Sequence, residues 1–279
     1  MSRLIVRTLL DRLVAGLVVL CVVLTAVPVL VLLLFVLIKG LPGMLASGFF
    51  TQPPHPVGFP GGGVFNAIIG TLEIVGVGSL LAVPFGTLVG IFLSEYGRNR
   101  VGDAVRFVSD VLTGLPSIAF GIFGYTVLVA TLGHFSAISA SVALAVLMLP
   151  VILRATETAL VMVPQSIREA GLALGAPRWR VTIEIVVPAA LGGIVTGGLL
   201  AMARAAGETA PLLFTALGND YLQVNPLQPM GALALTVFKN AIIPYTELQD
   251  QAWAAGLLLV ILVAFTNILA RLYVRRIQR

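Results

Sequence analysis

The chain has 279 residues, of which 58% are hydrophobic and only 10% are charged, with a mean hydropathy of +1.05. A soluble domain carries about 45–50% apolar and about 25% charged residues, so this composition excludes a soluble enzyme, a nucleic-acid-binding domain and a disordered chain. It indicates an integral membrane protein. The net charge of +5 is then interpreted from the positions of the basic residues along the chain.

Six apolar stretches are long enough to cross a bilayer, which takes about 20 residues at 1.5 Å rise each. They cover residues 13–38, 67–93, 108–132, 138–154, 189–209 and 252–272. The first is too long for a signal peptide and lacks a small-residue cleavage site, so we expect it to be retained. The sequence predicts an all-α membrane protein, with an N-terminal segment 1–12, a six-helix transmembrane domain 13–272 and a tail 273–279.

The basic residues predict the orientation of these spans. With six spans, fourteen of the 17 Lys and Arg residues fall on one side, Lys39 and Lys239 fall on the other, and Arg204 lies within the fifth span. Cytoplasmic loops carry the excess of Lys and Arg, so both termini are expected in the cytoplasm. The fourteen are Arg3, Arg7, Arg12, Arg98, Arg100, Arg106, Arg154, Arg168, Arg178, Arg180, Arg271, Arg275, Arg276 and Arg279.

The segments outside the spans and the rarer residues limit the possible sites. Residues 39–66 are rich in Pro and Gly and are expected to form a flexible connector. Residues 210–251 are half apolar, and part of this segment is expected to pack on or dip into the bundle. Cys21 is the single cysteine, so no intrachain disulfide is possible, and His55 and His134 are far apart, so no metal site is expected.

The loop between the fourth and fifth spans predicts a short helix. Ser166 and Glu169 have the spacing of a capping box. Gly175 is placed to end the helix and Pro177 to prevent its continuation. A helix of about two turns is unstable alone in water, so we expect it to pack on a soluble partner.

The fifth span combines small residues with charges. Gly193 and Gly197 form a small-xxx-small pair that permits close helix approach. Arg204 and Glu208 are four residues apart and so share a predicted helical face. Charges within a bilayer commonly line a substrate pathway, and the planar guanidinium suits an oxyanion such as phosphate or sulfate. The alternative is a structural Arg–Glu pair that holds helices together.

The spacing in this loop resembles the EAA motif of permease subunits of bacterial ATP-binding-cassette importers. The matching string is Glu169-Ala170-Gly171, three residues, Gly175, nine residues, Ile185, one residue, and Val187-Pro188. Gly171 and Val187 depart from the Ala and Leu of the consensus. The resemblance implies that Glu169, Ala170, Gly171 and Gly175 dock an ATPase subunit, and we refer to residues 157–188 as the EAA loop. The chain has no phosphate-binding G-x-x-x-x-G-K-[ST] string, so ATP hydrolysis is expected on a separate polypeptide.

The string Ala-Arg-Ala-Ala-Gly-Glu-Thr-Ala-Pro-Leu-Leu-Phe-Thr-Ala at residues 203–216 resembles a signature of the PstA family of phosphate importer permeases. Further agreement comes from Phe92-Leu-Ser-Glu-Tyr-Gly97, Pro116-Ser-Ile, Thr156-Glu157 and Asn267-Ile-Leu-Ala-Arg271. The resemblance implies a type I importer permease bundle that moves inorganic phosphate by alternating access. It also implies that Arg204, with Glu208 and Thr209 beside it, lies on the phosphate pathway.

The same resemblance implies the partners and the location. They are a PstC-type permease, two PstB-type ATPases that use ATP with Mg, a PstS-type phosphate-binding protein and the lipid of a bacterial inner membrane. No cofactor, no nucleic acid and no catalytic residue are expected for this chain. Two alternatives remain: a permease for another oxyanion, such as sulfate or molybdate, and an ion-coupled secondary transporter without ATPases. An intramembrane enzyme would need a nucleophile–base pair or a metal cluster, and neither is apparent.

Overall fold

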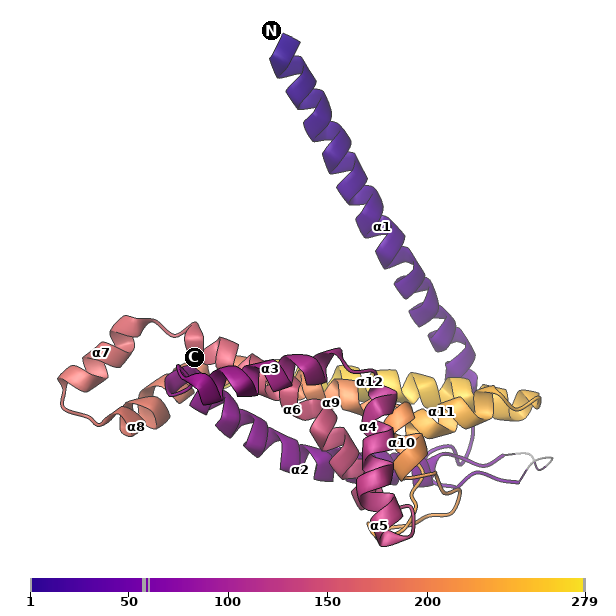
Figure 1. Cartoon of the computed structure of the whole chain (residues 1–279). Coiled ribbons are helices and arrows are strands. Elements are labelled where there is room, and N and C mark those ends of the chain that lie inside the picture. Colours follow the sequence, from indigo (N-terminus) through magenta and orange to yellow (C-terminus); the bar gives the residue numbers. More distant parts are fainter. Residues whose placement is uncertain (1, 57–58, 60, 278–279) are drawn as a thin grey trace.

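The computed structural model describes residues 2–56, 59 and 61–277. Within these residues every regular element is a helix (Figure 1), which confirms the predicted all-α class. Parts of three predicted segments lie outside the described residues. They are Met1 of the N-terminal segment, residues 57–58 and 60 of the connector, and residues 278–279 of the tail, which include Arg279.

Among the described residues, five helical stretches are long and apolar enough to cross a membrane. They are Leu10–Met44 within α1 (Ser2–Met44), α2 (Phe65–Glu95), α6 (Ala137–Val161), Arg178–Ala206, and Thr246–Leu269 within α12 (Thr246–Ile277). The stretch Arg178–Ala206 is built from α8 (Arg178–Val181), the π-helix η2 (Thr182–Val186) and α9 (Val187–Ala206). This span therefore begins well before the predicted residue 189.

The predicted third span is not one straight helix. It consists of α3 (Arg100–Gly114) followed by α4 (Ser117–Gly124), the π-helix η1 (Tyr125–Val129) and α5 (Ala130–Leu132), with a bend of 104° between the two parts. Leu115 at the break has φ −72° and ψ 140°. A residue that precedes proline favours this extended region, so Pro116 breaks the helix rather than kinking it. Six spans result if the bent pair crosses as one unit.

Helices α2, α6 and α9 form the centre of the bundle through close backbone contacts. A Cβ on Gly90 of α2 would lie 2.6 Å from the Cβ of Thr156 on α6. On α9, a Cβ on Gly193 would lie 2.6 Å from the Cβ of Ala159, again on α6. The small-residue pair predicted on the fifth span therefore packs against α6 of the same chain.

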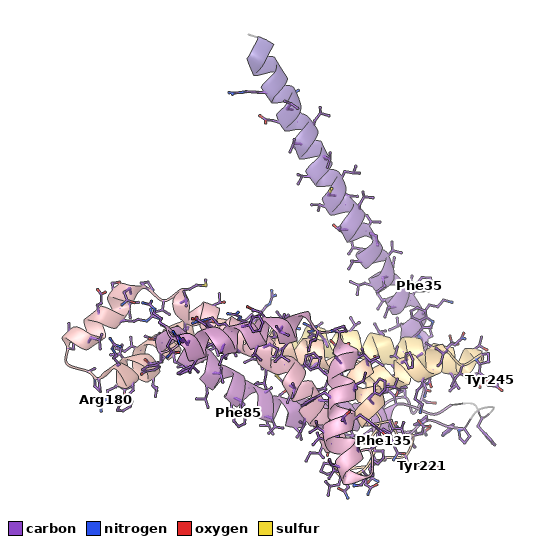
Figure 2. The ribbon with its side chains drawn as sticks, in the orientation of Figure 1. Phe35, Phe85, Phe135, Arg180, Tyr221 and Tyr245 are labelled. Carbon is purple, nitrogen blue, oxygen red and sulfur yellow. The ribbon has the colours of Figure 1, made fainter. Side chains whose placement is uncertain are left out.

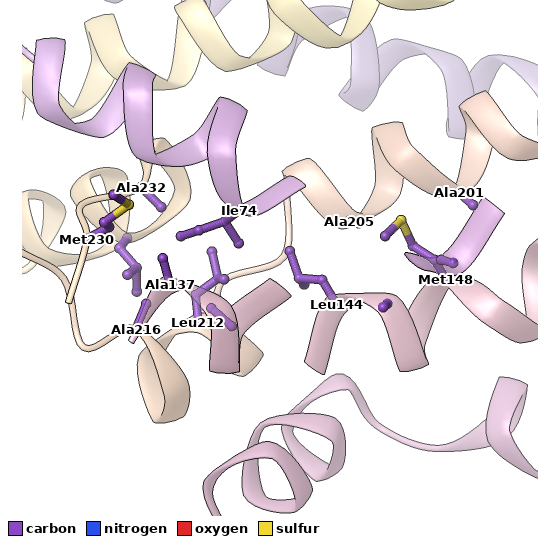
Figure 3. Close-up of a cluster of buried hydrophobic side chains, with 14 of the residues drawn as sticks. Ile74, Ala137, Leu144, Met148, Ala201, Ala205, Leu212, Ala216, Met230 and Ala232 are labelled. Carbon is purple, nitrogen blue, oxygen red and sulfur yellow. The ribbon is translucent and has the colours of Figure 1, made fainter. Parts of the chain in front are cut away.

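A core of apolar side chains fills the space between these helices and the segment after α9 (Figure 3). Ile74 of α2, Leu144 and Met148 of α6, and Ala205 of α9 belong to this core. Leu212 of α10 (Ala210–Thr215) also belongs to it, as do Ala216, Met230, Ala232 and Leu235. Part of the 210–251 segment therefore packs into the bundle, as predicted; it also contains α11 (Leu233–Ala241).

The N-terminal helix α1 projects from the rest of the molecule and meets it near its C-terminal end (Figure 1). There Phe35 lies edge-on to Trp253 of α12, with ring centroids 5.5 Å apart. The two ends of the connector after α1 pack on the bundle, because Phe49 and Val64 are buried against α12 and the Val64 amide donates to the Phe49 carbonyl. Buried apolar side chains fix the two ends of a segment whose Pro and Gly content suggested flexibility.

The close contact of α6 and α9 gives a first prediction. A Cβ on Gly197 would lie 2.2 Å from the Cβ of Ala155, whereas a Cβ on Gly198 meets nothing within 4 Å. Gly197→Ala is expected to destabilise the protein by about 1–3 kcal/mol through overpacking. Gly198→Ala is expected to be neutral or to stabilise by up to about 1 kcal/mol, since glycine weakens a helix interior. Thermal unfolding of the two purified variants compares them, and equal midpoints would contradict the tight packing of this face.

Candidate functional site

The predicted pathway residues gather where α9 ends. Arg204 lies in the last turn of α9, Gly207 caps that helix, and Glu208 and Thr209 lead into α10. The Arg204 Nε atom is 3.4 Å from Glu208 Oε1. The predicted shared helical face is wrong, because α9 ends at Ala206. The two side chains pair across the end of the helix instead.

Arg204 differs from the other internal arginines in how its guanidinium is used. Its side chain is 49% exposed while that of Glu208 is 17% exposed, and Glu208 engages only the Nε atom. Within the described part of the chain, the two terminal nitrogens have no protein acceptor. Arg106, Arg154 and Arg168, in contrast, donate through all their guanidinium nitrogens to carboxylates or carbonyls. Arg204 therefore presents an open, two-pronged donor that can bind an oxyanion.

The same face of α9 is exposed over several turns. Thr196, Leu200, Arg204 and Gly207 are all exposed, and their spacing of four, four and three residues places them on one side of the helix. The opposite side, with Ala201 and Ala205, is buried in the core. These four residues form an exposed stripe, with Arg204 near its end, that the described part of the chain leaves uncovered.

The EAA loop forms a short helix at the other end of α9, beyond the helices of the bundle (Figure 1). Helix α7 (Gln165–Ala173) ends in a Schellman arrangement, in which the Gly175 amide donates to Leu172 and the Ala176 amide to Gly171. Gly175 has φ +83°, a backbone conformation that glycine adopts freely. The predicted helix stop at Gly175 is therefore confirmed.

The predicted capping box is wrong. Helix α7 begins at Gln165 after Pro164, with no side-chain cap. Ser166 therefore lies inside the first turn of α7, where its hydroxyl is no longer in the N-cap position. The helix is held instead at its base, where Leu160, Val163, Val181 and Val186 form a small apolar core.

The four predicted docking residues divide between two faces. Glu169, Ala170 and Gly175 are exposed, whereas Gly171 is buried, and a Cβ there would lie 3.0 Å from Ile185 Cδ1 and Val181 Cγ2. Gly171 therefore sets the packing of α7 on the residues that follow it and is not part of the exposed surface. Leu174, which the sequence analysis did not single out, is 89% exposed at the tip of the loop. An exposed leucine beside a carboxylate is a surface that a protein partner can cover.

Two ion-pair groups that the sequence does not predict lie at the α7 end of the bundle. Glu157 of α6 is bonded by Arg106 of α3 at 2.7 Å and by Arg154 at 2.9 Å. Glu95, the last residue of α2, is bonded by Arg168 of α7 at 2.9 Å. These contacts place the α2–α3 and α6–α7 connections side by side, as the predicted topology requires. The local signal for them is the presence of Arg154 and Glu157 within the otherwise apolar α6, which does not show which distant residues they meet.

Other candidate residues do not form a further site. Among the described residues, no three His, Cys, Asp or Glu side chains are grouped as metal ligands. His134 is exposed just after α5, and Cys21 is exposed on α1. The chemistry available at the end of α9 is therefore the binding of an anion and the acceptance of a hydrogen bond or proton by a carboxylate.

The chain matches a known family and several known proteins. Residues 82–279 match the family described as binding-protein-dependent transport system inner membrane component. A phosphate transport system permease protein PstA of Yersinia pestis is 44% identical over 234 residues, which cover 84% of this chain and 79% of that protein. The Haemophilus influenzae protein of the same name is 42% identical and covers 86% of both chains. A PstA 1 protein of Mycobacterium tuberculosis is 38% identical over 89% of this chain and 82% of that protein.

Among solved structures, a chain of the MetNI methionine ABC transporter in an inward facing conformation is similar in fold. It superposes with a TM-score of 0.64 at 22% identity, covering 77% of this chain and 96% of that chain. At this identity the likeness shows the fold alone, which is that of an ABC importer permease.

Proposed function

The chain belongs to the PstA family of phosphate transport system permeases, within the binding-protein-dependent inner membrane components, and from this membership we propose that it forms half of the pathway by which an ATP-driven importer moves inorganic phosphate into the cell. The observation that carries the proposal is the open guanidinium of Arg204, which donates to Glu208 through Nε while its terminal nitrogens have no acceptor among the described residues. A phosphate ion can take both terminal nitrogens without displacing Glu208.

The chain works in this proposal as a non-catalytic permease subunit. A PstC-type permease covers the exposed stripe of α9 and supplies the other half of the pathway. Two PstB-type ATPases bind ATP with Mg, and one of them docks on the surface formed by Glu169, Ala170, Leu174 and Gly175. A PstS-type protein delivers phosphate at the opposite end, and the pathway alternates between outward and inward openings.

The proposed location is a bacterial inner membrane, with the EAA loop and both termini in the cytoplasm. The support is the distribution of basic residues. Arg98 and Arg168 lie in the connections at the α7 end, and Arg100, Arg178 and Arg180 lie at the starts of the helices that follow these connections. Figure 2 shows Arg180 at this end and Tyr221 and Tyr245 at the opposite end. The C-terminal helix also returns to the α7 end (Figure 1).

Glu208 favours phosphate over sulfate as the cargo. Phosphate carries at least one proton near neutral pH, and its P–OH group can donate a hydrogen bond to a carboxylate. Sulfate has no proton to donate, so a carboxylate beside Arg204 would only repel it. Molybdate also has no proton to donate near neutral pH, so it is disfavoured for the same reason.

The test is uptake of labelled phosphate into vesicles that contain the whole assembly and the binding protein. The proposal predicts ATP-dependent accumulation that a large excess of sulfate or molybdate does not inhibit. Inhibition of uptake by sulfate or molybdate in proportion to its concentration would instead identify a permease for a different oxyanion.

A further inference from the structure

A partly buried ion pair joins the EAA loop to the end of α2. Arg168 is in the second turn of α7, and its Nη2 and Nε atoms lie 2.9 Å and 3.3 Å from Glu95 Oε1. The same guanidinium donates to the carbonyls of Leu160 and Val163 at the end of α6. Both charged side chains are 14% exposed. We call this pair, Glu95 with Arg168, the strut.

The end of α2 that carries Glu95 is itself held by a second group of charges. Arg106 of α3 donates to the carbonyls of Leu93 and Gly97, each at 2.9 Å, and so clamps the last turn of α2 on both sides of Glu95. Its Nε atom reaches Glu157 of α6. A movement of the last turn of α2 would therefore be passed to α3 and α6.

The Glu157 group reaches further along α3. Arg154 donates to Glu157 Oε2 and, through Nε at 3.1 Å, to Asp110 of α3. It also donates to the backbone carbonyl of Arg106. We call Arg106, Arg154, Glu157 and Asp110 the Glu157 cluster; it ties α3 and α6 together next to the end of α2.

A cleft separates the EAA loop from the end of α2. It has a volume of about 560 Å³ and is lined by Tyr96 and Arg98 on one side and by Gln165, Arg178 and Thr182 on the other. Glu95 and Arg168 both line it, so the strut forms part of the wall of this cleft. Helix α7 itself packs on α8 and η2, whose Val181 and Val186 share a small apolar core with Ile91 of α2. The Glu95–Arg168 pair joins α7 directly to α2.

We propose that Glu95 and Arg168 are positioning residues that pass the displacement of α7 to α2, and through the Glu157 cluster to α3 and α6. The inference rests on the proposed function, since it needs an ATPase that moves α7. An ion pair of this kind is weak evidence for stability, and its place beside a cleft between two elements suits it to fixing the geometry between them. Without the strut, α7 would still pack on α8 and η2 and would still move with the ATPase. Helix α2 would keep the apolar contact of Ile91 but would lose the ion pair that fixes it to α7, so it would follow the movement less closely.

The test uses the complete assembly in vesicles and measures both phosphate uptake and ATP hydrolysis. Glu95→Gln and Arg168→Gln are expected to assemble and to hydrolyse ATP, but to lower the phosphate imported per ATP by about fivefold or more. Arg168→Lys keeps the charge but not the fork, so an intermediate ratio is expected. The double variant Glu95→Gln/Arg168→Gln should be no worse than either single variant, because each removes the same link. Asp103→Asn, which removes an exposed carboxylate at the same end while Arg106 keeps Glu157, is the matched control and should match the wild type.

The ratio of uptake to hydrolysis separates the possible outcomes. A wild-type ratio in the assembled Glu95→Gln and Arg168→Gln variants would overturn the inference. Uptake and hydrolysis that fall together, in proportion to the complex recovered, would assign the pair a structural role and overturn it as well. Failure of the wild-type assembly to import phosphate would instead refute the proposed function, so the two failures are distinguishable.

Discussion

Replacing Arg204 with glutamine is expected to abolish phosphate uptake while the complex still assembles. Glutamine keeps part of the length and polarity but removes the permanent charge and the two-pronged donor. A hydrogen bond to a charged group contributes about 1.5–3 kcal/mol, and each 1.4 kcal/mol is a factor of ten, so losing two such bonds lowers uptake by about 10²-fold or more. The measurement is the initial rate of labelled phosphate uptake, normalised to the complex recovered from membranes. Arg204→Lys should give an intermediate or poor transporter, because it keeps the charge without the fork.

The double variant Arg204→Gln/Glu208→Gln separates a pathway role from a structural one. In a purely structural pair, removing one partner leaves the other charge unpaired, and removing both restores assembly and function. In a pathway role, no positive charge returns to bind phosphate, so the double variant stays inactive. The exposed fork of Arg204 supports this second outcome. Recovery of most of the wild-type rate by the double variant would show that the pair only holds the structure together.

The second large effect is expected at Gly175, where a bulky side chain should block coupling. A Cβ there meets nothing within 4 Å in this chain, so a tryptophan at position 175 would point into open space. Gly175→Trp is therefore expected to insert and pack normally, apart from the strain of a positive φ, which for a bulky side chain costs about 1–3 kcal/mol. Uptake should nevertheless fall to background, because the side chain occupies the surface on which the ATPase docks.

Two further variants separate backbone strain from bulk at this position. Gly175→Asn keeps the left-handed conformation at little cost and should retain substantial uptake. Gly133→Trp places the same side chain at another glycine of positive φ with open space around it, φ +77°, at the opposite end of the bundle, and so controls for strain alone. ATPase subunits that co-purify with Gly175→Trp at the wild-type amount, together with undiminished uptake, would exclude the EAA loop as the coupling element.

The sequence predicts the parts of this structure that depend on local composition. Apolar length alone locates five spans, because a bilayer demands about 20 apolar residues wherever a helix crosses. Gly175 and Pro177 predict the end of α7, since a glycine in the left-handed conformation followed by proline stops a helix by backbone geometry. The small residues at Gly193 and Gly197 predict close helix packing, although not that α6 is the neighbour.

The features that could not be predicted depend on residues far apart in the chain. Arg106 and Glu157 are separated by 51 residues and Glu95 and Arg168 by 73, and no local spacing shows that they meet. The break at Pro116 is visible in the sequence only as a possible kink. The large bend between α3 and α4 occurs where α4 packs against α10. Helix α10 exists as a separate element because α9 ends at Ala206, before the predicted end of the fifth span. The sequence predicts that Arg204 and Glu208 pair along one helix, whereas they pair across the end of α9.

The most direct test is to measure whether ATP or an ion gradient drives phosphate accumulation. Vesicles that contain the assembly are loaded with ATP or left empty, and they are supplied with the binding protein and labelled phosphate. Accumulation of the label is measured before and after ionophores collapse all ion gradients. An ATP-driven permease predicts accumulation only in the ATP-loaded vesicles and no effect of the ionophores. Accumulation in vesicles without ATP that disappears when the gradients collapse would identify an ion-coupled secondary transporter and contradict the account.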